Sequence, residues 1–167
     1  MTEKVKRNYL EINSINDLNE RKKPSEEYSL SLIDPINFQL NKFFYKNIGK
    51  KHKWEDRLAW SEEKWIYYVS SENVQTYVCK FKNDLAGFFE LIYHLEKKET
   101  EIAYFGILEE YQNKKLGSYL LSEAIKISFQ NNTNRVWVHT CSLDHRNALN
   151  NYISRGMKIF KEEIIKI

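Results

Sequence analysis

The chain has 167 residues, of which 42% are hydrophobic and 14% aromatic, and its formal net charge at pH 7 is +3. This composition excludes an intrinsically disordered chain and predicts one globular domain with a sizeable core. The mild basic excess suits a polyanionic small molecule. Because the Lys and Arg residues are scattered along the chain, we expect no nucleic-acid partner.

We find no targeting or membrane segment in the sequence. The first residues are charged and lack the apolar core of a signal peptide, and no apolar run reaches membrane-spanning length. Cys79 and Cys141 lie in strand-like runs and are interpreted as reduced core thiols, while His52 and His94 lack the spacing of metal ligands. These features predict a cytoplasmic protein without membrane contact or metal.

The N-terminal segment begins with a short alternating run at residues 9–12, and a polar stretch follows to Pro24. We expect residues 1–27 to form an extension packed on the domain. The alternation at 28–32 then predicts a half-buried strand.

Helices and further strands follow in alternation. Asp34, with Pro35 at the first helical position, predicts a helix that ends at Gly49, and Ser61 predicts the cap of a second helix. Later helices are expected from Leu116 and after a cap at Asp144. Strands are predicted at 74–81, 85–95, 100–108 and 135–141, with 157–160 and 164–167 completing the sheet.

Residues 101–121 carry the strongest functional signal. An apolar, β-prone run at 102–108 enters a basic turn at 112–115, and an amphipathic helix begins at Leu116. A helix N-terminus offers unpaired N–H groups and the positive end of a dipole, so the turn is a candidate anion site. A plain solvated turn is the alternative.

This turn resembles the acyl-CoA-binding motif of the Gcn5-related N-acetyltransferases (GNAT), which reads Gln/Arg-x-x-Gly-x-Gly/Ala. Gln112 and Gly117 match it, and Lys115 stands where the family has its middle glycine. The family's next motif, Asn-x-x-Ala-x-x-Leu-Tyr-x-x-x-Gly-Phe, is similar to residues 145–157. Three of its residues match in register and three are replaced: the matches are Ala148, Tyr152 and Gly156, and the replacements are His145, Asn151 and Met157.

The resemblance implies an α+β fold in which helices flank a mixed, mostly antiparallel sheet whose strands splay at the acyl-CoA site. Residues 28–167 would form this single GNAT-like domain. The implied activity is acetyl-CoA-dependent transfer of an acetyl group to a primary amine of a small molecule or peptide, by direct attack in a ternary complex. A homodimer is compatible with this family.

The resemblance also assigns the residues that would contact coenzyme A. The strand before the turn would pair with the pantetheine arm, the turn would hold the pyrophosphate, and His145 would replace an asparagine that contacts the pantetheine arm or water. Gly106 marks a close approach of a ligand or, alternatively, a bulge. The full set is Phe105, Gly106, Ile107, Gln112, Asn113, Lys114, Lys115, Leu116, Gly117, Ser118 and His145.

Acetyl transfer needs a base for the amine and an acid for the departing thiolate. Two carboxylates lie in otherwise apolar strands, Glu90 and Glu101. We favour Glu101 as the base, because it aligns with the family's acidic position, and Glu90 is the second candidate. Tyr152 matches the family tyrosine that protonates the thiolate. Each of the three also fits an ordinary structural role, and His139 is a further candidate for the acceptor side.

The identity of the acceptor stays open. Tyr45, Trp54, Trp60 and Trp65 flank the expected loop between the first two helices, where they would form either an aromatic wall for the acceptor or part of the core. A catalytically silent acyl-CoA sensor of the same fold is the alternative function, and a basic RNA- or protein-binding module is a third.

Overall fold

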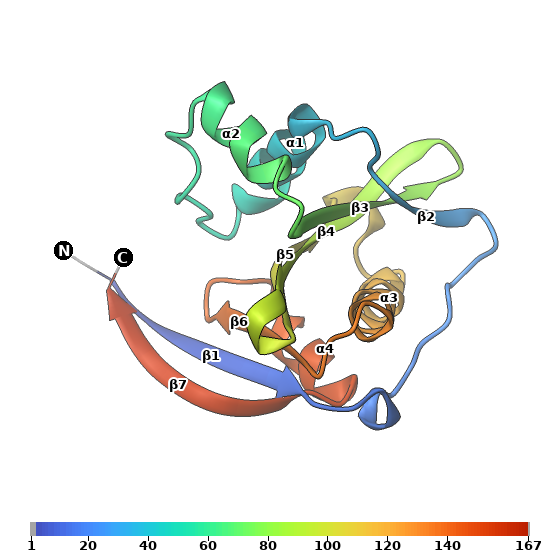
Figure 1. Ribbon diagram of the computed structural model, residues 1–167, viewed down its shortest axis with the longest axis vertical. Coiled ribbons are helices and arrows are strands. Elements are labelled where there is room, and N and C mark those ends of the chain that lie inside the picture. Colours follow the sequence, from blue (N-terminus) through green and yellow to red (C-terminus); the bar gives the residue numbers. More distant parts are fainter. Residues whose placement is uncertain (1–2, 167) are drawn as a thin grey trace.

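The computed structural model describes residues 3–166. A strongly curved sheet runs through the molecule with helices on both of its faces (Figure 1). Its strand order is β2-β3-β4-β5-β6-β1-β7, and the only parallel pair among these strands is β5 with β6. The strands are β1 (Lys4–Ile12), β2 (Tyr28–Leu32), β3 (Val74–Phe81), β4 (Asp84–His94), β5 (Glu99–Ile107), β6 (Arg135–Cys141) and β7 (Lys158–Lys166). The predicted α+β fold with a mostly antiparallel sheet is therefore confirmed.

The helices divide between the two faces of the sheet. Helices α1 (Phe38–Gly49) and α2 (Glu62–Val69) cover one face, and α3 (Leu116–Gln130) and α4 (Ala148–Ser154) cover the other (Figure 1). The larger core lies under α3, where its apolar side packs on β1, β4, β5 and β6. A smaller cluster joins α1 to β3 and β4, with the rings of Phe44 and Phe88 stacked at 4.8 Å.

The N-terminal segment supplies an internal strand of the sheet. Strand β1 pairs antiparallel with β6 on one side and with β7 on the other, so both of its edges are hydrogen-bonded. The expected extension at residues 1–27 therefore contributes to the sheet itself, with Leu10 and Ile12 in the core. Only the short alternation at 9–12 indicated this strand in the sequence, and it extends from Lys4 to Ile12.

The start of α1 differs from the prediction, whereas the start of α2 agrees with it. Helix α1 begins at Phe38 and not at Pro35, because the side chain of Asn37 caps it by accepting a hydrogen bond from the Gln39 N–H at 3.1 Å. The predicted cap at Ser61 is confirmed, since its hydroxyl accepts from the Lys64 N–H at 3.2 Å.

At the C-terminal end, α4 begins at Ala148, and Asp144 does not cap it. Asp144 instead accepts hydrogen bonds from the Thr140 hydroxyl at 2.5 Å and the Cys141 N–H at 3.1 Å. One continuous strand, β7, replaces the two short strands expected after residue 157, and residue 167 lies outside the described residues.

Within residues 3–166, no helix is both long and apolar enough to cross a membrane.

Candidate active site

A cavity of about 830 Å³ opens where β5 and β6 part. The two strands pair in parallel over only three residues of each, Glu99–Glu101 with Arg135–Trp137, and they diverge beyond that point. All five residues from 103 to 107 line the cavity, because this edge of β5 has no neighbouring strand. The predicted splay is therefore present, and the volume falls within the usual range of ligand pockets.

The turn before α3 forms one end of the cavity. Asn113 and Lys115 have φ angles of 60° and 64°, and Lys115 is the N-cap of α3 without any side-chain capping bond. The first N–H groups of α3 therefore remain available for an anion. Gln112 fixes the turn to β5, because its side-chain amide donates to the Ile107 carbonyl at 3.2 Å.

Most of the predicted turn residues line the cavity, namely Gln112, Asn113, Lys115, Gly117 and Ser118. Two do not. Leu116 is 1% exposed within the core under α3, and the Lys114 ammonium lies 5.6 Å from the centre of the Tyr111 ring. Only their backbone groups could then contribute to an anion site.

Phe105, Gly106 and Ile107 all line the cavity, but the absence of a side chain at Gly106 has a packing reason. A Cβ at this position would lie 2.8 Å from the Cγ2 of Ile48, so the glycine lets α1 pack closely on β5. The alternative of a bulge at Gly106 is wrong. The register shifts between the pairs Glu90–Tyr104 and Leu91–Ile102, and Ala103 is therefore the extra residue.

Glu101 faces the cavity, and its side chain is 18% exposed. The Nε2 atom of His94 lies 3.1 Å from its Oε1, and the His94 ring is in turn stacked on Trp137, with 6.1 Å between centroids. This packing orients a carboxylate that is still open to a ligand.

Tyr152, on α4, also lines the cavity. Burial raises the pKa of its phenol well above the ordinary value, and the negative charge of Asp144 raises it further. The phenol is therefore protonated at neutral pH and able to donate its proton. Its ring lies 6.4 Å from that of Phe105.

Two histidines of the cavity are less basic than free histidine. Burial lowers the pKa of His145, and the nearby His52 lowers it further, while the Nδ1 atom of His145 accepts a hydrogen bond from the Asn147 N–H at 3.1 Å. His139 faces the open cavity, yet the surrounding walls desolvate it and lower its pKa, and the charge of Arg7 adds to this effect. Both imidazoles are therefore largely neutral at pH 7.

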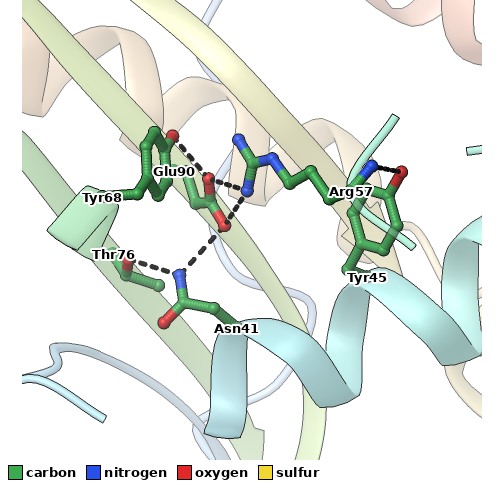
Figure 2. A network of polar contacts seen from close by, with 6 residues as sticks. All are labelled: Asn41, Tyr45, Arg57, Tyr68, Thr76 and Glu90. Atoms are coloured by element: carbon green, nitrogen blue, oxygen red, sulfur yellow. Dashed lines mark hydrogen bonds and ion pairs between the residues drawn. The ribbon is translucent and has the colours of Figure 1, made fainter. Parts of the chain in front are cut away.

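Glu90 lies in a buried polar network under α1 and α2 (Figure 2). It is 0% exposed. Its Oε1 accepts from Arg57 at 3.0 Å and from the Tyr68 hydroxyl at 2.7 Å, and its Oε2 accepts from the Asn41 amide at 2.9 Å. Both carboxylate oxygens are occupied by hydrogen bonds, and Glu90 itself does not line the cavity, so the geometry argues against Glu90 as a base.

Arg57 is a residue of the cavity wall that the sequence did not indicate, because a lone arginine in a basic loop carries no pattern. Its guanidinium lies 4.3 Å from the ring centres of both Tyr68 and Tyr104 and 4.7 Å from that of Trp60. The backbone N–H of Arg57 also donates to the Tyr45 hydroxyl at 2.9 Å (Figure 2). The ion pair with Glu90 and these rings hold the loop at residues 50–61 against the sheet.

Only two of the four aromatic residues predicted to form a wall for the acceptor line the cavity. Trp54 and Trp60 line the cavity, but Tyr45 and Trp65 are each 1% exposed and belong to the packing beneath it. Among residues 3–166 there is no group of three or more His, Cys, Asp or Glu side chains arranged to hold a metal ion.

A family model described as "Acetyltransferase (GNAT) family" matches residues 36–157. No curated protein matches the chain significantly. Solved structures with the same fold include a GCN5-related N-acetyltransferase from Sphaerobacter thermophilus, with 12% identity and a TM-score of 0.70 over 97% of this chain and 50% of that one. The chain thus spans about half the length of this relative, and 56% of a second such protein from Kribbella flavida.

Two further structures are similar in fold and closer in length. One is an aminoglycoside acetyltransferase from an uncultured soil metagenomic sample, with 12% identity and a TM-score of 0.65 over 80% of this chain and 90% of that one. The other is a Bacillus subtilis acetyltransferase in complex with CoA, with 19% identity and a TM-score of 0.59 over 80% of this chain and 78% of that one.

Proposed function

The chain belongs to the GNAT family of acetyltransferases, and we propose that it transfers an acetyl group from acetyl-CoA to a primary amine of a small molecule or peptide. The amine attacks directly, with both substrates bound. The observation that carries this proposal is the opening between β5 and β6, where the Glu101 carboxylate, a protonated phenol and an uncapped helix N-terminus line one cavity.

The turn before α3 is the proposed pyrophosphate site. Asn113 and Lys115 are left-handed, a conformation in which successive N–H groups can form a concavity for an anion, and the N-terminus of α3 would add the positive end of its dipole. The unpaired edge of β5 at residues 103–107 would hydrogen-bond the pantetheine arm. Bound acetyl-CoA would supply the activated acetyl group at the far end of this edge.

Glu101 is the proposed base. An alkylammonium group has an ordinary pKa of about 8 to 10.4 and must lose a proton before it can attack. The Glu101 carboxylate is open to the cavity and oriented by His94, so it accepts this proton directly or through a water molecule.

Tyr152 is the proposed acid. Its buried phenol keeps its proton at neutral pH, and it donates that proton to the sulfur atom of the leaving group. Tyr152 on α4 and Glu101 on β5 line the same cavity, so acid and base come from different elements.

The first test is calorimetric titration with acetyl-CoA, together with dephospho-CoA, followed by thiol release with a panel of amines. We expect micromolar binding of acetyl-CoA and turnover with at least one amine. Tyr152→Phe should lower kcat by about 10²- to 10⁴-fold with unchanged acetyl-CoA affinity. Binding without turnover on any amine would favour the acyl-CoA sensor, and no binding at millimolar ligand would exclude both functions.

A further inference from the structure

Strand β1 brings two side chains from the N-terminal segment into the cavity, Val5 and Arg7. They are two residues apart and therefore point to the same face of the sheet. The strand lies between β6 and β7, in the curved part of the sheet that is drawn below α1 and α2 in Figure 1. Both residues precede the region that the family model matches, residues 36–157.

The guanidinium of Arg7 is only weakly paired. Its closest ion-pair contact is 3.7 Å, to Oε1 of Glu163 on β7, and that oxygen already accepts the Tyr9 hydroxyl at 2.6 Å. The Nε atom of Arg7 is buried and has no hydrogen-bond partner among residues 3–166. Its side chain is 30% exposed, so it has donors to offer to a ligand in the cavity.

Arg57 and Arg135 are bound differently. The Arg57 side chain is 6% exposed and its NH1 lies 3.0 Å from Glu90. Arg135 contacts two carboxylates, Glu11 at 2.5 Å and Glu99 at 2.9 Å. Arg7 is thus an arginine at the cavity whose closest carboxylate lies beyond hydrogen-bond distance.

Arg7 lies on the same face of the sheet as the proposed base. Arg7 pairs in register with Cys141, and Tyr9 with His139, on β6. Glu101 pairs with Trp137 on the same strand. Because Trp137, His139 and Cys141 alternate to one face, His139 lies between the positions of Glu101 and Arg7.

The pKa of His139 is consistent with a position between Arg7 and Glu101. Burial lowers the pKa of His139 most, Arg7 lowers it further, and Glu101 opposes both effects. The imidazole therefore senses the guanidinium on one side and the carboxylate on the other. All three side chains line the cavity.

We propose that Arg7 binds an anionic group of the acceptor, so that the acceptor is an amine that also carries a carboxylate or phosphate. The inference rests on the proposed acetyl transfer. The ammonium group lies at Glu101, where it loses its proton, and the anionic group lies beyond His139 at the guanidinium of Arg7. A planar guanidinium binds either anion through two parallel hydrogen bonds.

The test compares paired acceptors, one with and one without the anionic group. Phenylalanine is paired with phenylalaninamide, and phosphoethanolamine with ethanolamine, so the two pairs distinguish a carboxylate from a phosphate. Rates of thiol release from acetyl-CoA are measured for the unmodified protein, Arg7→Gln and Lys6→Gln. Lys6 is a control because it is next to Arg7 on β1, points to the other face and is also ion-paired, to Glu162 at 3.3 Å.

We expect the anionic member of one pair to have a kcat/KM about 10- to 100-fold above its neutral partner, through a lower KM. Arg7→Gln should remove this preference, so that the two members of the pair have similar kcat/KM, while Lys6→Gln should keep it. Equal rates within both pairs, or a preference that survives in Arg7→Gln, would overturn the inference and leave acetyl transfer standing.

If no amine is acetylated, the proposed acetyl transfer is excluded. Calorimetry then tests the anion site at Arg7 independently of that activity. Titration of N-acetylphenylalanine and its amide into the CoA-saturated protein measures the anion site without turnover. Binding of the acid alone, lost in Arg7→Gln, would support an anion site at Arg7. Equal binding of acid and amide would exclude it.

Discussion

Glu90 on β4 and Glu101 on β5 are carboxylates of neighbouring strands. They point to the same face of the sheet, because Glu101 pairs with Ile92, which lies two residues after Glu90 on β4. Helices α1 and α2 cover Glu90, and hydrogen bonds from Arg57, Tyr68 and Asn41 occupy its oxygens (Figure 2). Glu101 lies past the edge of that cover and opens on the cavity.

The difference shows that the surroundings decide what a strand carboxylate does. A buried carboxylate is stable only when it is paired and fully hydrogen-bonded, and such a group holds structure together. A carboxylate that is oriented from one side and open on the other can exchange a proton with a ligand. We therefore expect substitutions of Glu101 to affect turnover and substitutions of Glu90 to affect folding.

The largest effect is expected for Glu101→Gln. Loss of the base should lower kcat by about 10²- to 10⁴-fold, while acetyl-CoA affinity and the melting temperature change little. Glu99→Gln is the matched control, because Glu99 lies two residues earlier on β5 and is bound to Arg135 at 2.9 Å. Equal activity of the two variants would show that Glu101 is not the base.

Glu90→Gln should destabilise the fold by about 3 to 5 kcal/mol, because the buried Arg57 charge would lose its counter-ion. Urea unfolding measures the change. Glu162→Gln breaks an exposed ion pair with Lys6 and should cost less than about 1 kcal/mol. A double-mutant cycle of Glu90→Gln and Arg57→Gln should be strongly non-additive, and additive energies would contradict the coupling.

Lys115→Gly is expected to have a smaller effect, of the opposite sign. Lysine adopts a left-handed conformation at this position, with a φ angle of 64°, at a cost of about 1 kcal/mol that glycine does not incur. Urea unfolding should show a gain of up to this amount. The adjacent Lys114→Gly should show no gain, and equal changes in both variants would mean that the turn is unstrained.

The sequence predicted β2 to β6 better than β1 and β7, the strands at the two ends of the chain. Periodicity and caps located β2 to β6 and the N-terminus of α2, and the two motifs located the cavity end at α3 and the tyrosine of α4. Strand β1 was harder to foresee. Its partners β6 and β7 come more than 100 residues later in the chain, and no local pattern encodes such a pairing.

The predicted N-cap residue was correct for one helix and wrong for two others. Ser61 capped α2 as expected, but Asn37 replaced Asp34 as the cap of α1, because several residues with similar capping propensity lie near that helix start. Asp144 does not cap α4, because its carboxylate accepts a hydrogen bond from the Thr140 hydroxyl. Propensity therefore identified the helices more reliably than their first residues.

What the sequence determined by itself was the alternation of its strands, the unpaired helix start after residue 115, and the residue types that acetyl transfer needs. Those features depend on local backbone geometry and on side-chain chemistry. Only the tertiary structure decided that Arg57 pairs with the Glu90 carboxylate. It also decided that the Glu101 carboxylate is accessible from the cavity and that Arg7 of β1 lines the same cavity. Each of these depends on which segments cover a shared face of the sheet, and that choice is made by packing between residues far apart in the chain.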